Sequence, residues 1–336
     1  MLVPVLAALF GHASFTSTAP NKPRQAGASA YCSSSDGTYQ LTSVTAPVSG
    51  AGSPGSESTW KLTVDDTSSG YMQTITGFGA AITDATVTNF NDLNADTLDA
   101  LLTDLLTSSG ANFNLFRHTI GASDLSADPV YTYDDNGGSV DTTLAGFNLG
   151  DRGTAMATLI AQMQKKNSDV KVLGTPWSAP GWMKLDDAID GTTTNNNLND
   201  GYLGSGVGTA GYSSEFAQYF VKYIQAYANL DATVNYLTIQ NEPLNSQSGY
   251  PTMYVFADES GDLINSYVGP ALANAGLDVD IWAYDHNTGT CICIFKLFPL
   301  LYFPYYPGFP CFHYSPISSL VGFLRVVYWV TELHYL

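Results

Sequence analysis

The chain has 336 residues, with 12 lysines and arginines against 30 aspartates and glutamates and a net charge of −18. The acidic residues are spread along the chain, and phosphate neutralisation requires basic patches, so nucleic acid is not expected as a partner. The length exceeds that of an average domain and predicts one large domain with a small appendage.

Residues 1–20 are expected to be a secretory signal peptide. Met1 to Phe10 form a short apolar run followed by small and polar residues, which is the length of a secretory hydrophobic region rather than of a membrane span. A basic stretch before the run is missing, so an ordinary buried N-terminal segment and a misassigned start stay open as alternatives. The expected localisation is extracellular.

The cysteines predict neither a disulfide framework nor a metal site. Cys32 is alone in the first 290 residues, whereas Cys291, Cys293 and Cys311 crowd the end. The Cys-Ile-Cys pair lacks the two-residue spacer and the second pair of ligands that zinc sites use. No metal or other cofactor is therefore expected.

Strand and helix signals alternate along most of the chain. Residues 26–74 are rich in Ser, Thr and Gly and have short alternating stretches such as residues 60–64, which predict a β-rich segment at a domain edge. Beyond it, short apolar runs ending in polar residues alternate with helical stretches, which predicts a parallel sheet. Helices are expected over residues 96–106 and 213–227, the second with a Ser-Ser cap before Glu215. The expected strands are 75–81, 113–118, 170–177, 234–240 and 279–284, five where a (β/α)8 barrel needs eight.

Two long insertions, residues 122–149 and 184–211, interrupt this alternation. Both are rich in Asn, Asp, Gly, Thr and Tyr, and both follow the ends of expected strands. Loops of this length in a compact domain are usually functional or disordered, and barrel active sites are built at such strand ends. Both insertions are therefore candidates for the rim of a site.

The composition changes abruptly at about Gly289. Residues 289–336 hold one acidic residue, Glu332, and five prolines among many Phe, Tyr and Leu residues. Proline at that density cannot continue helices or central strands, and Lys296 and Arg325 interrupt any membrane span. We expect residues 75–288 to supply the first five βα units of a barrel. The tail is expected to be aberrant, for example mis-spliced, and to leave the barrel incomplete.

The strongest local signal is the run from Tyr236 to Pro243, an apolar strand that ends in Asn241 and Glu242 before the proline. Such a glutamate projects from the carboxyl edge of a parallel sheet. Hydrolysis of a glycoside requires a carboxylic acid there, which protonates the leaving oxygen and later activates water. Asn241 can hydrogen-bond a sugar hydroxyl beside the reacting carbon. The structural alternative is a surface glutamate before a loop, and neighbouring segments favour the catalytic interpretation.

One such segment is residues 173–184, a strand that runs into a rigid turn presenting Trp177 and Trp182. Flat aromatic faces with polar edges suit the C–H faces of sugar rings. The alternative is that both indoles pack in the core. This segment therefore predicts a sugar-binding surface beside the Glu242 strand.

Two further segments place charged groups at strand ends. Arg117 precedes Asp124 by seven residues, and an arginine can hold a catalytic carboxylate ionised, although such a pair could also merely pin a loop. Polar residues also follow the strand at 279–284, among them His286. Both His118 and His286 are expected to be hydrogen-bonded scaffolding rather than catalysts.

Six ordered motifs between Trp60 and Thr288 resemble those of glycoside hydrolase family 30. Within that family they are most similar to fungal endo-β-1,6-galactanases. The resemblance implies a (β/α)8 barrel with an attached β-sandwich, retaining hydrolysis by two glutamates, and no metal. The motifs are Gly-Phe-Gly-Ala-Ala-Ile-Thr-Asp (77–84), Phe-Arg through Asp (116–124), Tyr-Thr-Tyr-Asp-Asp (131–135), Thr-Pro-Trp-Ser-Ala-Pro-Gly-Trp-Met-Lys (175–184), Gln-Asn-Glu-Pro (240–243) and Ala-Tyr-Asp-His-Asn (283–287).

The resemblance also implies roles for individual residues. Glu242 would be the acid/base and Asn241 its substrate-binding neighbour. Arg117, Asp124 and Trp177 would line the subsite that holds the reacting sugar.

The family's nucleophile is a second glutamate on a later strand, and here the tail departs from the family's pattern. The only candidate is Glu332, after a segment whose prolines cannot form the helices that a barrel needs there. Without a second carboxylate about 5 Å from the first, retaining hydrolysis cannot proceed.

Three hypotheses follow. The first is a secreted, monomeric, retaining endo-β-1,6-galactanase that acts on a polysaccharide or glycan. The second keeps the chemistry and changes the sugar, as in a β-1,6-glucanase or a glucosylceramidase-like enzyme. The third is an inactive carbohydrate-binding or misfolded truncated product that lacks the nucleophile.

Overall fold

The computed structural model describes residues 29–45, 67–70, 75–192, 196–200, 211–245, 247–286 and 313–314. The expected signal peptide, the stretch over residues 60–64, Glu332 and nearly all of the tail at 289–336 lie outside the described residues. The chain divides into two compact units, Met1–Tyr71 and Met72–Leu336, and each is described by itself.

The first unit contains a short hairpin. Strands β1 and β2 pair antiparallel, and in the turn between them the Asp36 carboxylate accepts hydrogen bonds from Ser34 and Thr38. These hydrogen bonds lower the pKa of Asp36 to about 2. The described part of residues 26–74 contains two strands, and the β-sandwich expected there stays a prediction. The elements are β1 (Ala30–Cys32), β2 (Thr42–Val44) and η1 (Ser68–Gly70).

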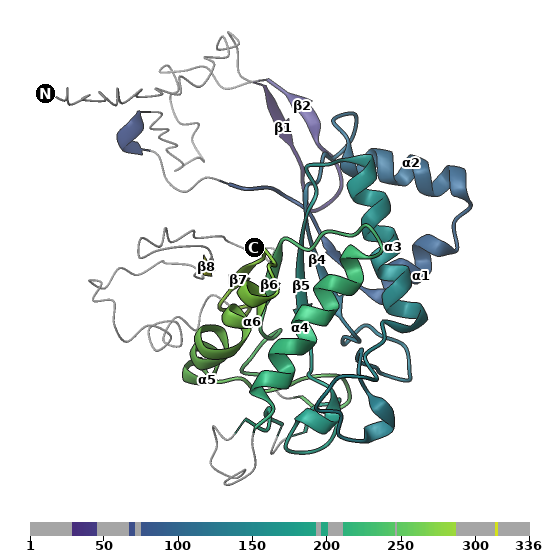
Figure 1. Ribbon diagram of the computed structural model, residues 1–336. Helices are drawn as coiled ribbons and strands as arrows, with labels where there is room; N and C mark the ends of the chain where they lie inside the picture. The colour runs from purple at the N-terminus through teal and green to yellow at the C-terminus, as the bar shows by residue number, and fades with distance from the viewer. Residues whose placement is uncertain are drawn as a thin grey trace, which may run out of the picture. The chain divides into compact units, whose positions relative to one another are not determined.

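The second unit is built on a sheet of strands that pair in chain order, and the first five of them are parallel (Figure 1). Each of the five overlaps one of the five strands expected from the sequence, so the predicted parallel sheet is confirmed. The last, β8, pairs antiparallel with β7. The strands are β3 (Ala81–Ile82), β4 (Leu115–Ile120), β5 (Lys171–Pro176), β6 (Tyr236–Thr238), β7 (Asp280–Trp282) and β8 (His313–Tyr314).

Six strands do not close a barrel of eight, and no further strand of this sheet is found among the described residues. Most of residues 289–336 lies outside those residues. The predictions that the barrel is incomplete and that the tail is aberrant therefore stay predictions.

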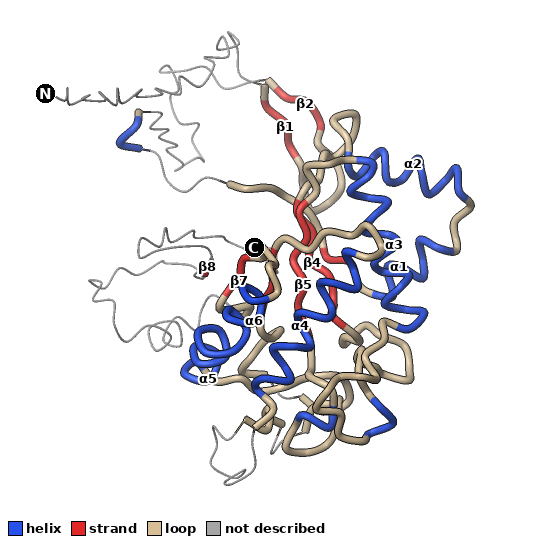
Figure 2. The backbone as a smooth tube through the Cα atoms, viewed as in Figure 1, coloured by secondary structure: helices blue, strands red, loops and turns tan. Residues whose placement is uncertain are grey.

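Helices connect the strands, as the alternation predicts (Figure 2). The helices expected at 96–106 and 213–227 are confirmed as α2 and α4. The expected Ser-Ser cap is wrong, because Tyr212 is the N-cap residue of α4 and both serines lie inside the helix. The helices are α1 (Asp84–Asn91), α2 (Ala95–Leu106), α3 (Gly150–Lys166), α4 (Ser213–Ala228), α5 (Ala257–Asp262), η4 (Leu263–Val268) and α6 (Gly269–Asn274), with the short turns η2 (Asn136–Gly138) and η3 (Gly181–Met183).

Strand β4 sends adjacent side chains to opposite faces of the sheet, because side chains alternate along a strand. His118 packs among the tyrosines of α4, stacking on Tyr227 and hydrogen-bonding the Tyr223 hydroxyl through Nε2. Burial lowers the pKa of His118 to about 3, so the ring is neutral. The scaffolding interpretation of His118 is therefore confirmed. The neighbouring Arg117 side chain lies on the opposite face of the sheet from α4.

Candidate active site

A network of buried polar groups lies at the carboxyl ends of β4 to β7. Its centre is Asp285, just after β7, whose Oδ2 atom accepts hydrogen bonds from Arg117 Nη2 at 2.8 Å, Thr175 Oγ1 at 2.9 Å and Thr238 Oγ1 at 3.0 Å. Only 9% and 12% of the Arg117 and Asp285 side chains are exposed, so this ion pair is largely withdrawn from water. The three donors offset the cost of burying the carboxylate.

These contacts show that the sheet is curved. In a flat sheet β4 and β7 would lie three strand spacings apart, roughly 14 Å. One oxygen atom of Asp285 nevertheless contacts side chains from β4, β5 and β6. The face of the sheet that carries Arg117 is therefore concave at the carboxyl ends of the strands, as closure towards a barrel requires.

Arg117 joins the network to two other residues that the sequence analysis selected. Its Nη2 atom donates to Asn241 Oδ1 at 2.6 Å, and its guanidinium lies over the Trp177 ring, 4.8 Å from the centroid. Arginine has no acceptor atoms, so it bonds the oxygen of the Asn241 amide and leaves the NH2 group free to donate elsewhere. These three residues thus lie together, and their role in substrate binding stays a prediction.

Glu242 follows Asn241 in a left-handed backbone conformation, with φ of +43°. Its N–H donates to the carbonyl oxygen of Asp285 at 2.8 Å, and its Oε2 atom accepts a hydrogen bond from Asn245 Nδ2 at 2.7 Å. Strained backbone of this kind in a non-glycine residue clusters at functional sites, where surrounding contacts hold it in place. The half-buried carboxylate is thereby held at the carboxyl edge of the sheet.

The two indoles of residues 173–184 have different surroundings. Trp182 is 2% exposed, donates from Nε1 to the Asp134 carbonyl oxygen at 2.8 Å and meets Tyr212 edge to face. It is therefore a core residue, which is the alternative left open for it. Trp177 is also buried, with 7% of its surface exposed, but it lies beside Arg117 in the network described above, and its role in sugar binding stays a prediction.

The pairing of Arg117 with Asp124 is wrong, because Arg117 pairs with Asp285 instead. Asp124 is exposed, and no hydrogen bond or ion pair of its side chain is found among the described residues. Its predicted role in substrate binding therefore stays a prediction.

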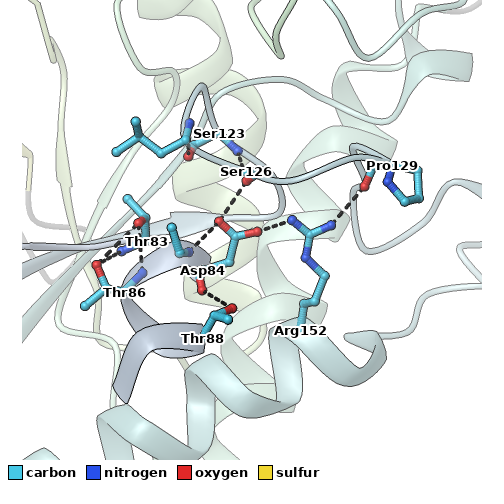
Figure 3. A network of polar contacts seen from close by, with 10 residues as sticks. Thr83, Asp84, Thr86, Thr88, Ser123, Ser126, Pro129 and Arg152 are labelled. Atoms are coloured by element: carbon cyan, nitrogen blue, oxygen red, sulfur yellow. Dashed lines mark hydrogen bonds and ion pairs between the residues drawn. The ribbon is translucent and has the colours of Figure 1, made fainter. Parts of the chain in front are cut away.

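The loop that carries Asp124 is anchored near the start of α1 (Figure 3). The buried Asp84 carboxylate accepts a hydrogen bond from Ser126 Oγ at 2.8 Å and pairs with Arg152 of α3. Arg152 Nη1 also donates to the Pro129 carbonyl oxygen at 2.8 Å. The insertion at 122–149 is thus tied at Ser126 to α1 and at Pro129 to α3.

Several network residues were given no role by the sequence analysis. Thr175 and Thr238 are buried polar residues in otherwise apolar strands, which is a signal that could have found them. Asp285 stands at a strand end, and Asn245 follows Glu242 by three residues, within reach of a turn. Local patterns mark such residues as unusual but do not give their partners.

The described residues contain neither a cluster of His, Cys, Asp and Glu ligands nor a membrane-spanning helix. No group of three or more His, Cys, Asp or Glu side chains is arranged to hold a metal ion. No helix there is long and apolar enough to cross a membrane.

Two fungal relatives match most of the chain. An endo-1,6-beta-D-glucanase of Aspergillus fumigatus is 68% identical over 273 residues, covering 81% of this chain and 56% of that protein. An endo-1,6-beta-D-glucanase of Trichoderma harzianum is 62% identical over 292 residues, covering 86% of this chain and 59% of that protein. The chain therefore spans little more than half the length of these relatives.

A solved structure described as the endo-beta1,6-glucanase BT3312 matches with a TM-score of 0.61 and 28% identity, covering 77% of this chain and 53% of that chain. The model of the glycosyl hydrolase family 30 TIM-barrel domain matches residues 75–292, which include β3 to β7 and the whole Arg117–Asp285 network. These relatives are glucanases, so the expected likeness to galactanases is not supported. By the family model, which matches more than half of its residues, the chain belongs to glycosyl hydrolase family 30.

Proposed function

We propose that this chain supplies the acid/base half of a secreted, retaining hydrolase that cleaves β-1,6-glucan. The observation that carries the proposal is the Glu242 carboxylate, held by Asn245 at the carboxyl edge of the sheet beside the Arg117–Asp285 network. The names of the two fungal relatives favour glucan over galactan as the substrate.

In this proposal Glu242 protonates the leaving glycosidic oxygen and then, as a carboxylate, removes a proton from the attacking water. Asn241 donates from its NH2 group to a sugar hydroxyl, because Arg117 occupies its oxygen. Trp177 offers an aromatic surface for the ring, and Asp124 a carboxylate for a hydroxyl group. Asp285 acts through Arg117, which it orients.

The proposed reaction needs a second carboxylate about 5 Å from Glu242 to form the glycosyl-enzyme intermediate. Asp285 is engaged by three donors and is not proposed for this role. Glu332, the sequence candidate, lies outside the described residues. A 2-fluoro glycoside with a good leaving group should label Glu332, and mass spectrometry of the labelled peptide tests this assignment.

The main test is hydrolysis of a linear β-1,6-glucan by the full chain. We expect glucose oligomers as products, first released as the β-anomer, and a loss of turnover of roughly 10²- to 10⁴-fold in Glu242→Gln. Glu215→Gln on α4 makes the same chemical change outside the network and should keep wild-type turnover.

Two outcomes would change the proposal. Release of galactose oligomers from a β-1,6-galactan, with no release from the glucan, would overturn the assigned sugar. A folded chain that binds the glucan without cleaving it would favour the carbohydrate-binding alternative. That alternative has one observation in its favour, because Arg117, Asn241 and Trp177 are assembled next to Glu242.

Secretion and a monomeric state are also part of the proposal. Removal of residues 1–20 during expression in a secreting host, read by N-terminal sequencing, tests the first. Light scattering of the purified chain tests the second.

A further inference from the structure

The insertion at 122–149 contains a buried carboxylate without a hydrogen-bond partner. Asp134 is 1% exposed, and neither Oδ1 nor Oδ2 has a partner among the described residues. Burial, together with the nearby carboxylates of Asp141 and Asp135, raises the pKa of Asp134 to about 6. A carboxylate withdrawn from water is costly unless a cation or several donors offset its charge.

Three oxygen atoms converge beside Gly146. The point where a Cβ atom on Gly146 would stand lies 3.0 Å from Asp134 Oδ1, and 3.3 Å from both Asn136 Oδ1 and Asp141 Oδ2. Only a residue without a side chain leaves this space open. The unpartnered Asp134 oxygen is thus aimed at the same small space as two other acceptor oxygens, where mutual repulsion would be expected without a cation.

The local hydrogen bonds orient these oxygens. Asn136 donates from Nδ2 to the Ser139 carbonyl oxygen at 3.1 Å, which directs its Oδ1 atom away from Ser139. Asp141 Oδ2 accepts from the Gly146 N–H at 2.7 Å, and Asp141 Oδ1 accepts from Thr143 Oγ1 at 2.9 Å. The acceptors are therefore held in place by the loop itself.

The other charged groups near Asp134 do not occupy the space beside Gly146. Asp135 is engaged by the backbone N–H and the hydroxyl of Thr132. Lys222 of α4 interacts with Asp134 electrostatically, but among the described residues it forms no ion pair within 4.0 Å of that carboxylate. Asn136 and Gly146 are exposed, so an ion and its water ligands can enter from solvent.

We propose that Asp134, Asn136 and Asp141 bind a calcium ion in the space beside Gly146. Carboxylate and amide oxygens are the ligands that Ca²⁺ prefers, and its tolerance of irregular geometry and of water ligands suits a loop with three side-chain oxygens better than the strict octahedron of Mg²⁺. The Asp134 carbonyl oxygen accepts the hydrogen bond of Trp182. The ion would therefore stabilise the insertion and its attachment to the turn at residues 173–184, without taking part in bond cleavage.

The test is calcium binding by the full chain after treatment with a chelator. Titration calorimetry with CaCl2 should show one site, and CaCl2 should raise Tm more than MgCl2 at equal concentration. Asp134→Asn should weaken calcium binding roughly tenfold or more, because it removes a charged ligand. Asp169→Asn, the same change at an exposed position outside the insertion, should bind calcium like the wild type.

Gly146→Ala keeps the test decisive if Asp134→Asn fails to fold. The added methyl group occupies the space between the three oxygens, so calcium binding should be lost while the loop keeps its other hydrogen bonds. Lys222→Met should tighten calcium binding because it removes a nearby positive charge. Absence of calcium binding by the wild-type chain, or wild-type binding in both Asp134→Asn and Gly146→Ala, would overturn the proposal.

Discussion

At the scale of single residues, the Arg117–Asp285 pair is the most consequential contact in the candidate site. The pair is largely buried, and Asp285 also accepts hydrogen bonds from two threonines. Arg117→Met would leave this carboxylate buried without its counter-charge. We expect a loss of about 3–5 kcal/mol in the free energy of unfolding, measured by urea denaturation.

The double variant Arg117→Met/Asp285→Leu is the control for this prediction. It removes both charges, and replacing a buried ion pair with apolar side chains is often close to neutral. Most of the lost stability should therefore return, while glucan hydrolysis should not. A single variant as stable as the wild type would show that the pair is more hydrated than its burial indicates.

Asn245 is expected to position Glu242 rather than to contact substrate. It donates one hydrogen bond to Glu242 Oε2 at 2.7 Å, and such a bond contributes about 1–1.5 kcal/mol. Under the proposed function, Asn245→Ala should lower kcat by roughly tenfold and leave KM nearly unchanged. An equal effect from Gln247→Ala, an exposed change in the same loop, would attribute the loss to the loop and not to this hydrogen bond.

The sequence selected four residues that lie together in or beside the network, and it gave one of them the wrong partner. Asn241, Trp177 and Glu242 follow apolar strands and Arg117 lies within β4, and parallel strands bring such positions together. Asp124 was paired with Arg117 because it is near in the chain. The true partner, Asp285, is 168 residues away, and only the curvature of the sheet brings it within reach.

At the scale of elements, the start of α5 carries a buried carboxyl group. Glu259 is 1% exposed and accepts a hydrogen bond from the Phe256 N–H at 2.7 Å. Burial, and next the negative charge of Asp200, raise the pKa of Glu259 from 4.5 to about 9. The folded chain therefore binds more protons than the unfolded chain between these values, and this group makes stability fall as pH rises from about 4.5 to 9.

Glu259→Gln should remove this pH dependence. Glutamine keeps an oxygen for the Phe256 N–H and an NH2 group for Asp200, but it does not ionise. Thermal melts should show that the variant is more stable than the wild type at pH 8, by a margin that shrinks towards pH 5. Glu215→Gln on α4 is the matched control. A constant margin at all pH values would contradict the assigned cause.

The elements themselves were largely predictable, because five apolar runs end in polar residues at the carboxyl edge of the sheet. The capping residue of α4 was not predictable. Tyr212 donates its N–H to the Asn199 carbonyl oxygen and accepts the N–H of Phe216, so a contact with the preceding insertion fixes the first turn of the helix. The Ser-Ser pattern favours a cap in isolation, but this tertiary contact makes Tyr212 the N-cap residue and leaves both serines inside the helix.

At the scale of the whole molecule, the net charge of −18 makes electrostatic repulsion a general cost of folding. Added salt screens that repulsion, since the Debye length falls from about 30 Å at 0.01 M to about 8 Å at 0.15 M ionic strength. Salt also weakens favourable pairs such as Lys166–Asp99, whose aspartate is 70% exposed, but an exposed pair contributes at most about 1 kcal/mol.

The loss of repulsion should therefore outweigh the loss of favourable pairs. We expect Tm to rise as NaCl increases from about 0.01 to 0.15 M. The buried Arg117–Asp285 pair is screened much less and should not reverse the trend. Thermal melts in NaCl, with a chelator present to exclude calcium, measure the effect. Tetramethylammonium chloride at equal ionic strength should give the same rise, because screening does not depend on the cation. A rise with sodium alone would indicate a specific ion site, and a fall in Tm would show that favourable ion pairs outweigh the repulsion.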